Sequence, residues 1–188
     1  ANSSDLTVTI AKQFKCKIIL DPPNLSGFGN SLINAFKNLN SDFFCIFDGD
    51  NSFDPKSIDI MSNKINEGYD FVFASRYKNN EVSEDDDFFS KIANYIFTKT
   101  VSFLFNISTT DVLFLYVLGR SESIKQLNLN QKDYSICTEV LIKAYKNFKC
   151  FEILSKERKR LYGKSKVNKI LAAFTLMKNI IKLYYSIK

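Results

Sequence analysis

The chain has 188 residues, of which 45% are hydrophobic, and a formal net charge of +6. This length and apolar content suit one compact domain with a sizeable core. The absence of histidine excludes the commonest general base and transition-metal ligand, so acid–base chemistry falls to carboxylates, lysine or tyrosine. The four cysteines are widely spaced and form no CxxC pair, which disfavours a zinc site. We expect them to be buried free thiols in a reducing compartment.

The hydrophobic pattern predicts helices and strands that alternate along the first half of the chain. In order, we expect a helix at 6–14, a strand at 16–20, a helix at 31–39, a strand at 43–47, a helix at 55–67 and a strand at 69–76. Such alternation is typical of a mainly parallel sheet with helices on both faces. The predicted fold class is therefore α/β.

The second half is predicted to be mostly helical. We expect a polar, acidic segment at 78–87, helices at 88–105 and 135–148, a strand at 148–154 and a last helix at 167–187. The whole chain, 1–188, reads as one domain that ends in an amphipathic helix at 167–188. No signal peptide is visible, and no apolar run reaches the ~18 residues of a membrane-spanning helix. The chain opens without methionine and without a first strand, so we expect it to be part of a longer protein.

Carboxylates follow directly after an apolar strand. Asp48 and Asp50 come after FFCIF at 43–47, with Gly49 between them. In open α/β sheets, ligands bind at the carboxyl ends of the strands. Two close carboxylates suit a hard divalent cation such as Mg²⁺, which can neutralise charge on a diphosphate leaving group.

Two other interpretations of this acidic segment stay open. The carboxylates could cap the helix predicted to begin at Pro55, and Asp54 suits that role because it immediately precedes the proline. DGDNSFDPKSID also resembles an EF-hand calcium loop. However, Phe53 occupies the place of the required glycine, and Asp59 that of the bidentate glutamate.

Motifs along nearly the whole chain resemble those of the family 2 glycosyltransferases, which have the GT-A fold. They are NSSDLT at 2–7, SGFGNSLINAF at 26–36, DGDNSFDP at 48–55, FASRY at 73–77, SKIANYIF at 90–97, TTD at 109–111, CTEVLIKAY at 137–145 and RLYGKSK at 160–166. The last fits R-x-x-G-x-S-K at every fixed position and is the most specific. Within the family, the chain is most similar to the polyprenyl-phosphate and dolichol-phosphate sugar transferases.

The resemblance implies a metal-dependent transfer, with inversion, from a nucleotide diphosphate sugar to a polyprenyl phosphate or a glycan. The implied metal is Mg²⁺ or Mn²⁺, held by Asp50 and Asp48. The implied roles are nucleotide-sugar binding by Asp5, Gly29, Asp48, Asp50 and Arg76, phosphate binding by Arg160, Ser165 and Lys166, and catalysis by Asp111 and Glu139.

Several of these roles have plainer alternatives. Asp111 could cap the following element, and a base matters less if the acceptor is a lipid phosphate, which is already an anion. Glu139 could lie on a solvated helix face, and Arg76 could form a structural ion pair. Gly29 could only shape a turn, and Arg160 could belong to a solvated basic surface.

Some positions depart from the family pattern and leave the acceptor class open. Leu115 and Val117 stand where the resemblance leads us to expect glycine and arginine, and Asp86 stands where a basic residue is usual. Two other classes of function therefore remain. One is a nucleotidyltransferase with a similar sheet, and the other is a degenerate module that binds nucleotide or membrane without turnover.

The carboxyl-terminal segment is strongly basic. Glu157 is the only acid in residues 156–188, so we expect an anionic partner there. Of the candidates, we favour a phosphate group or an anionic membrane surface and expect no nucleic acid. The lysine-rich helix at 167–188 is predicted to lie on the membrane, which would place the protein peripherally on a cytoplasmic face. The alternative is that its apolar stripe packs on the sheet.

Overall fold

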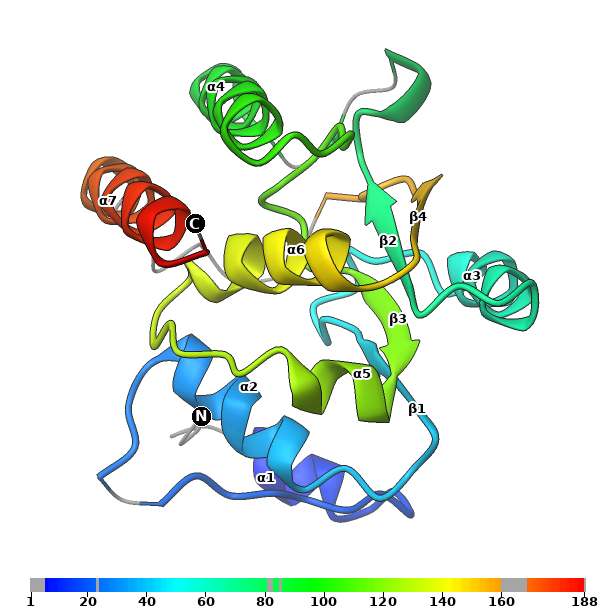
Figure 1. Cartoon of the computed structure of the whole chain (residues 1–188). Helices are drawn as coiled ribbons and strands as arrows, with labels where there is room; N and C mark the ends of the chain where they lie inside the picture. Colours follow the sequence, from blue (N-terminus) through cyan, green and yellow to red (C-terminus); the bar gives the residue numbers. More distant parts are fainter. Residues whose placement is uncertain (1–5, 23, 81–82, 85, 160–168, 188) are drawn as a thin grey trace.

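A four-stranded sheet with helices on both faces forms the centre of the molecule (Figure 1). The computed structural model describes residues 6–22, 24–80, 83–84, 86–159 and 169–187. In chain order, its elements are α1 (Thr7–Ala11), α2 (Phe28–Lys37), β1 (Phe43–Ile46), α3 (Ser57–Asn66), β2 (Phe71–Ser75), the 3-10 turn η1 (Lys78–Asn80), α4 (Phe88–Phe105), β3 (Val117–Arg120), α5 (Ser121–Gln126), α6 (Ile136–Asn147), β4 (Cys150–Leu154) and α7 (Lys169–Ile187).

The strand order is β1-β3-β2-β4. Strand β3 is antiparallel to both β1 and β2, with Phe43 opposite Arg120 and Phe71 opposite Gly119. Strands β2 and β4 are parallel, with Phe71 opposite Cys150. Three of the four strands share one direction, but two of the three strand pairings are antiparallel, so the sheet is mixed rather than mainly parallel. The α/β class with helices on both faces agrees with the prediction.

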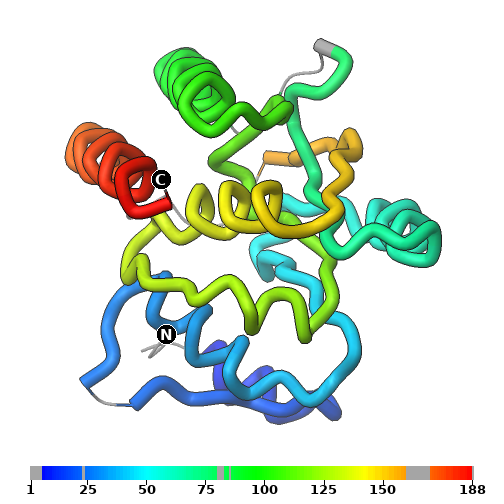
Figure 2. Tube along the Cα trace, viewed as in Figure 1, coloured from blue at the N-terminus to red at the C-terminus, as the bar shows by residue number. Residues whose placement is uncertain are grey.

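The pleat of β2 explains why both faces of the sheet are covered. Phe71 and Phe73 belong to one hydrophobic cluster, whereas Val72 and Ala74 belong to the other. Successive side chains of a strand point to opposite faces, so β2 must be buried on both sides. Helix α3 packs on the Val72 face, and helices α2, α4, α5, α6 and α7 contribute to the Phe71 cluster (Figures 1 and 2).

Strand β3 and helix α5 are absent from the sequence prediction. The segment DVLFLYVLGR at 111–120 is apolar almost throughout, so neither a two-residue nor a helical period is visible. In the structure β3 lies between β1 and β2, and its Val117 and Leu118 are buried on opposite faces. A strand buried on both faces loses the alternation that would reveal it.

The predicted strand at 16–20 is wrong. These residues have no regular secondary structure, and the side chains of Ile19 and Leu20 are 37% and 63% exposed. A strand needs a hydrogen-bonding neighbour, and no described segment pairs with this one. The predicted helix at 6–14 shortens to α1, while the helix expected at 31–39 begins earlier, at Phe28.

The prediction of a helix at 88–105 is confirmed at both ends. The side chain of Asp87 accepts a hydrogen bond from the Ser90 backbone N–H at 2.8 Å, which caps the amino end of α4. Asn106, with φ of 52°, ends the helix in the left-handed conformation. Asp87 is therefore part of the helix terminus.

The cysteines are free thiols, but they are not all buried. Cys137 is buried in α6 and Cys150 is half-buried, whereas Cys16 and Cys45 are exposed. The expectation of four buried thiols is therefore wrong for two of them. Burial raises the pKa of the Cys137 thiol to about 12, so it stays protonated and unreactive at neutral pH.

Helix α7 divides its apolar side chains between the core and the surface. Leu176, Ile180 and Leu183 are buried in the main hydrophobic cluster. The window Ile170–Ile187 has a mean hydropathy of 1.2 and only 17% of it is buried. By length and composition alone it could cross a membrane, which corrects the expectation that no segment could do so.

Candidate functional site

The site lies at one edge of the sheet, where the segments after β1, β2 and β4 meet the segment before β3. Because β1, β2 and β4 share one direction, their carboxyl ends lie at the same edge. Asp48 follows β1, Arg76 follows β2, Glu157 follows β4, and Asp111 precedes β3. The sheet therefore gathers groups that are up to 109 positions apart in the sequence, from Asp48 to Glu157.

The loop after β1 presents its carboxylates at this edge. Asp48 and Gly49 are exposed and Asp50 is half-buried. The Oδ1 atom of Asp50 accepts hydrogen bonds from the backbone N–H and the hydroxyl of Ser52, at 3.0 and 2.6 Å. Asn51 has φ of 70°, a left-handed conformation that asparagine tolerates better than most residues. This turn fixes the orientation of the Asp50 side chain.

Aromatic packing holds the base of the same loop. Phe53 is 5% exposed and stacks on Tyr116 with ring centroids 4.7 Å apart. The Tyr116 hydroxyl donates to the backbone oxygen of Asp54 at 2.8 Å. Phe53 therefore fills the core at the position where an EF-hand would need glycine, which removes the calcium-loop interpretation. Asp54 also accepts from the Lys56 N–H at 3.3 Å, in agreement with a role near the start of α3.

The basic segment after β4 lies against the acidic loop. The backbone N–H of Arg158 donates to the Ser52 oxygen at 2.9 Å, and its guanidinium donates to Asp54 Oδ1 at 3.1 Å. Arg158 was not among the predicted site residues. Four of those that were, namely Asp5, Arg160, Ser165 and Lys166, lie outside the described residues.

Arg76 is the centre of a buried ion network. Its side chain is 8% exposed and makes a two-pronged contact with Asp111, Nε to Oδ2 at 2.7 Å and Nη2 to Oδ1 at 3.0 Å. Its Nη1 donates to Asp86 at 3.0 Å and to Glu157 at 3.2 Å. Burial alone would lower the pKa of Arg76, but Asp111, with Glu157 and Asp86, raises it, so the guanidinium stays charged.

The network changes how Asp111 and Asp86 are interpreted. Asp111 is 0% exposed, and both of its carboxylate oxygens accept from Arg76. This placement favours the structural ion pair over a general base that meets substrate. Asp86, where the resemblance leads us to expect a basic residue, closes the network and accepts from the Tyr77 hydroxyl.

Glu157 is a partner that the sequence interpretation missed. The only signal for it was its isolation as a single acid within a basic run. Its carboxylate accepts from Arg76 and from the Ser83 hydroxyl. Burial raises the pKa of Glu157 against the opposing charge of Arg76, so its ionisation is less favourable than that of an exposed glutamate.

Glu139 lies apart from this network. It is 2% exposed, so the interpretation of a solvated helix face is wrong. Its carboxylate accepts from the backbone N–H groups of Asn130 and Gln131, at 3.0 and 2.8 Å, and pairs with Lys143 at 2.8 Å. These contacts anchor the loop before α6 and favour a structural role over catalysis.

Gly29 permits a close backbone approach. A Cβ atom there would overlap the Gln131 carbonyl oxygen and lie 2.8 Å from the Lys132 carbonyl carbon. The Gly29 N–H donates to the Lys132 oxygen at 3.1 Å. Gly27, with φ of 102°, adopts a conformation that other residues rarely reach. The two glycines thus fit α2 against the loop that Glu139 anchors.

We expect Gly29→Ala to lower the free energy of unfolding by about 1–3 kcal/mol, because the added methyl group meets rigid backbone. Urea denaturation followed by circular dichroism measures this. Gly49→Ala is the control, since a Cβ there meets nothing within 4 Å. If Gly29→Ala were as stable as the control but bound nucleotide less well than the unsubstituted protein, a direct donor contact would be supported instead.

The acidic loop has the donor set of a Mg²⁺- or Mn²⁺-type site. In the described part of the chain, no three histidine, cysteine, aspartate or glutamate side chains come together as a metal cage. Mg²⁺ needs only one or two carboxylates and takes its other ligands from water and substrate phosphates. Asp48 and Asp50 supply hard oxygen donors at the open end of the sheet, so their chemistry fits such an ion.

The mixed sheet flanked by helices has the GT-A fold, as comparison with solved structures shows. Glucosyl-3-phosphoglycerate synthase from Mycobacterium tuberculosis with uridine diphosphate matches with a TM-score of 0.74 at 12% identity, covering 97% of this chain and 66% of that one. Its complex with Mn²⁺, UDP-glucose and phosphoglyceric acid matches with 0.71 at 11% identity and the same coverage. A structure described as a mycobacterial protein matches with 0.72 at 9% identity, covering 94% and 59%.

The chain belongs to glycosyl transferase family 2, whose sequence model matches residues 1–127. It spans just under two thirds of the length of the synthase structures. A comparison with curated proteins gives no significant match. The expected fold class and family are thereby confirmed.

Proposed function

We propose that the protein of which this chain is part transfers a sugar from a nucleotide diphosphate sugar to an acceptor, with a polyprenyl phosphate as the favoured acceptor and a glycan as the alternative. The observation that carries the proposal is the position of Asp48 and Asp50 at the binding edge of a GT-A sheet. Family membership supports the same class of reaction. The matching synthase structures contain UDP, UDP-glucose, Mn²⁺ and phosphoglycerate, which supports a uridine nucleotide donor and a phosphorylated acceptor here.

Each part of the site has a defined task in this proposal. Asp50, fixed by Ser52, and Asp48 would hold Mg²⁺ or Mn²⁺, which supplies positive charge to the leaving diphosphate. Arg160, Ser165 and Lys166 would bind the donor or acceptor phosphates. An acceptor oxygen forms the new bond to the anomeric carbon as the bond to the diphosphate breaks, so the configuration inverts.

The Arg76 network supports an acceptor that is already an anion. A hydroxyl acceptor needs a base to remove its proton, whereas a phosphate oxygen can attack as it is. Asp111, the candidate base, has both oxygens engaged by Arg76 and is fully buried. The engagement of Asp111 by Arg76 therefore favours a polyprenyl phosphate over a glycan hydroxyl as the acceptor.

A donor assay on the full-length protein tests the proposal. We expect hydrolysis of UDP-glucose in the presence of Mn²⁺, none with chelator, and faster consumption when a polyprenyl phosphate is added. Release of pyrophosphate instead of UDP would support the nucleotidyltransferase alternative. Binding of UDP without turnover of any nucleotide sugar would support the degenerate module.

The phosphate-binding assignment has a test of its own. We expect Arg160→Ala to lower activity at least about tenfold, because an arginine that forks onto phosphate oxygens contributes more than a solvated charge. Lys159→Ala is the matched control, since Lys159 is the neighbouring cation outside the motif. Equal losses in the two variants would favour a diffuse basic surface.

A polyprenyl phosphate acceptor implies a membrane location. Consistent with the sequence expectation, we propose that the protein acts peripherally at the cytoplasmic face of a membrane. The lysines of 169–188 and the free thiols support that location.

A further inference from the structure

Helices α4 and α7 lie side by side and expose an unusual amount of apolar surface. They contact each other, and the rings of Phe105 and Tyr184 lie 5.8 Å apart between them. Figure 1 shows both helices nearly end-on, away from the sheet. Of the described residues, the large apolar side chains exposed on these two helices are Phe88, Phe89, Ile92, Tyr95, Ile96 and Phe103 on α4, and Ile170, Leu171, Phe174, Ile181, Tyr185 and Ile187 on α7.

On α4 the exposed apolar residues form one stripe. Phe89, Ile92, Ile96 and Phe103 are spaced i, i+3, i+7 and i+14, which places them on one side of a helix. Phe89 is 77% exposed and Phe103 is 85% exposed. In contrast, Phe97, Val101 and Phe105 on the same helix are buried in the core. Helix α4 is therefore apolar on both its core side and its outer side.

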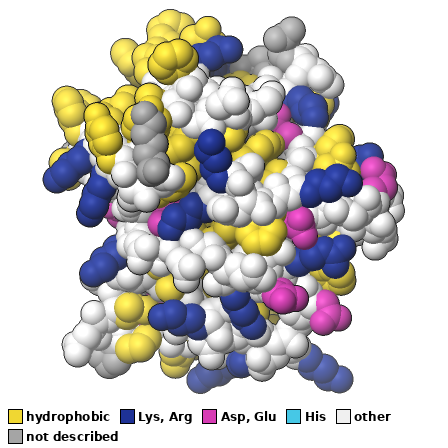
Figure 3. All heavy atoms as spheres, in the orientation of Figure 1, with side chains coloured by type: hydrophobic (Ala, Val, Ile, Leu, Met, Phe, Trp, Pro, Cys, Tyr) yellow, Lys and Arg dark blue, Asp and Glu magenta, His cyan; other side chains and the backbone are white. Residues whose placement is uncertain are grey.

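Helix α7 repeats this arrangement. Ile170, Phe174, Ile181 and Tyr185 are spaced i, i+4, i+11 and i+15, and their exposed fractions range from 46% to 74%. The opposite side of α7, with Leu176 and Ile180, is buried. Figure 3 shows hydrophobic side chains over both helices at the upper left of the molecule, with lysine and arginine side chains beside them. We call these two outer stripes together the α4–α7 surface.

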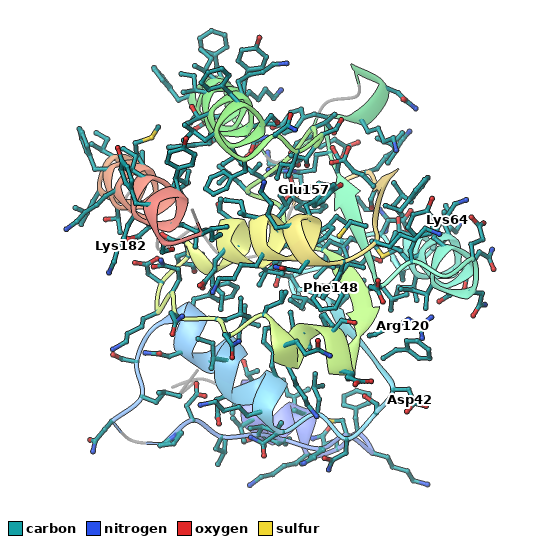
Figure 4. All side chains as sticks on the ribbon, in the orientation of Figure 1. Asp42, Lys64, Arg120, Phe148, Glu157 and Lys182 are labelled. Atoms are coloured by element: carbon teal, nitrogen blue, oxygen red, sulfur yellow. The ribbon has the colours of Figure 1, made fainter. Side chains whose placement is uncertain are left out.

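The charges on the two helices have one sign. Neither α4 nor α7 contains an aspartate or glutamate. Lys91 and Lys99 lie on α4, and Lys178 and Lys182 lie on α7, where both are exposed. The ammonium group of Lys99 lies 5.5 Å from the ring centroid of Tyr95, another exposed side chain of α4. In Figure 4, the labelled Lys182 points outward from α7. Apolar area flanked by lysines is the pattern of a surface that lies in a membrane interface.

We propose that the α4–α7 surface docks the protein onto an anionic lipid bilayer. The aromatic and aliphatic stripes enter the boundary between headgroups and acyl chains, and the lysines contact anionic headgroups. The proposed lipid acceptor gives this docking a use, but the binding itself does not depend on nucleotide or metal. Helix α4 provides half of the surface, and its part in docking is visible only in the tertiary structure.

Two other occupants fit the surface less well. A second copy of the chain would bring lysines of one copy against those of the other, with no carboxylate on either helix to balance them. A membrane-spanning α7 would have to remove Leu176, Ile180 and Leu183 from the core and place Lys178 and Lys182 inside the bilayer. A bilayer surface satisfies both the apolar stripes and the charge.

Flotation with lipid vesicles tests the proposal on the chain without nucleotide or metal. We expect binding to mixed phosphatidylcholine–phosphatidylglycerol vesicles at low salt and much weaker binding to phosphatidylcholine alone. High salt should release the protein, because it screens the lysines. The double variant Lys178→Ala and Lys182→Ala should weaken binding about 25-fold, since each lysine near an anionic surface contributes about fivefold.

Substitutions of the apolar stripe provide the second arm. We expect the double variant Phe89→Ser and Phe103→Ser to weaken vesicle binding at least tenfold while its urea midpoint stays near that of the parent, because both side chains lie outside the core. Phe14→Ser is the control, since Phe14 is 67% exposed and follows α1, which lies at the opposite end of the molecule from α4 and α7 (Figure 1).

Three results would overturn the proposal. Binding that ignores both lipid charge and salt would indicate an inserted α7. A concentration-dependent dimer in solution that the Phe89→Ser and Phe103→Ser double variant abolishes would indicate a second copy. If Phe14→Ser weakened vesicle binding as much as the Phe89→Ser and Phe103→Ser double variant, the α4–α7 surface would not be the lipid-binding surface. Binding of UDP with Mn²⁺ is measured separately. It tests the proposed sugar transfer, whereas the vesicle assays test only the proposed lipid docking.

Discussion

Arg76→Met is expected to lower the free energy of unfolding by about 3–5 kcal/mol at neutral pH. The substitution keeps an apolar stem of similar length but removes the only cation that contacts Asp86, Asp111 and Glu157 within the described network. Three carboxylates would then remain close together, with Asp111 fully buried. Uncompensated buried charge is among the most destabilising changes that one substitution can produce.

The loss of unfolding free energy in Arg76→Met should become smaller as the pH falls. Without Arg76, the pKa of Glu157 should rise further in the folded variant, because the positive charge that opposes the effect of burial is gone. A group with a raised pKa in the folded state gives stability at low pH that is lost as the pH rises through that pKa. Burial already raises the pKa of Glu157 in the parent, so as the pH falls Glu157 should take up a proton at a higher pH than an exposed glutamate. The difference between parent and variant is therefore expected to be smaller near pH 5 than near pH 7.5.

Urea denaturation at the two pH values measures this effect, and Arg120→Met is the matched control. The Arg120 side chain is 40% exposed, and its Nε lies 3.8 Å from Asp70 Oδ1. An exposed pair of this kind contributes about 0.2–1 kcal/mol. Adding Asp111→Asn to Arg76→Met should recover part of the stability by removing the most buried of the stranded charges. The assignment of Arg76 as the centre of the network would be contradicted if Arg76→Met lowered the free energy of unfolding no more than Arg120→Met does. It would also be contradicted if the loss in Arg76→Met did not depend on pH.

Asp50→Asn is expected to weaken Mn²⁺-dependent binding of UDP by about 100-fold or more. Substitution of groups that only support metal ligands already costs about 10–100-fold in affinity, so loss of a ligand charge should cost at least as much. The asparagine oxygen can still accept from the Ser52 N–H, as Asp50 Oδ1 does at 3.0 Å. The loop should therefore keep its shape, and the loss should report on the charge.

Isothermal titration with UDP, with and without Mn²⁺, tests this prediction. Asp59→Asn is the control, because Asp59 is an exposed carboxylate on α3 in the same stretch of sequence. Both variants should keep the thermal midpoint of the parent within a few degrees. Unchanged metal-dependent affinity in Asp50→Asn, or an equal loss in Asp59→Asn, would remove Asp50 from the proposed metal site.

The sequence alone determined the features that depend on neighbouring residues. The apolar run at 43–47 identified a strand, and the carboxylates after it led to the prediction of a ligand-binding edge there. The cap at Asp87 and the left-handed Asn106 bound α4 at the predicted residues. The ordered series of short motifs identified the family, which the match over residues 1–127 confirms. Such signals are local because helix periods, caps and turns are decided within a few positions along the chain.

Only the tertiary structure decided which distant groups meet. Arg76 contacts Asp111 and Glu157, which lie 35 and 81 positions further along the chain. Nothing local to Asp111 distinguishes a base from an ion-pair partner, because both require the same carboxylate. The direction of β3 and the division of α7 between core and surface depend in the same way on what lies opposite them. Burial and charge pairing are properties of the assembled neighbours, so a segment's own pattern cannot specify them.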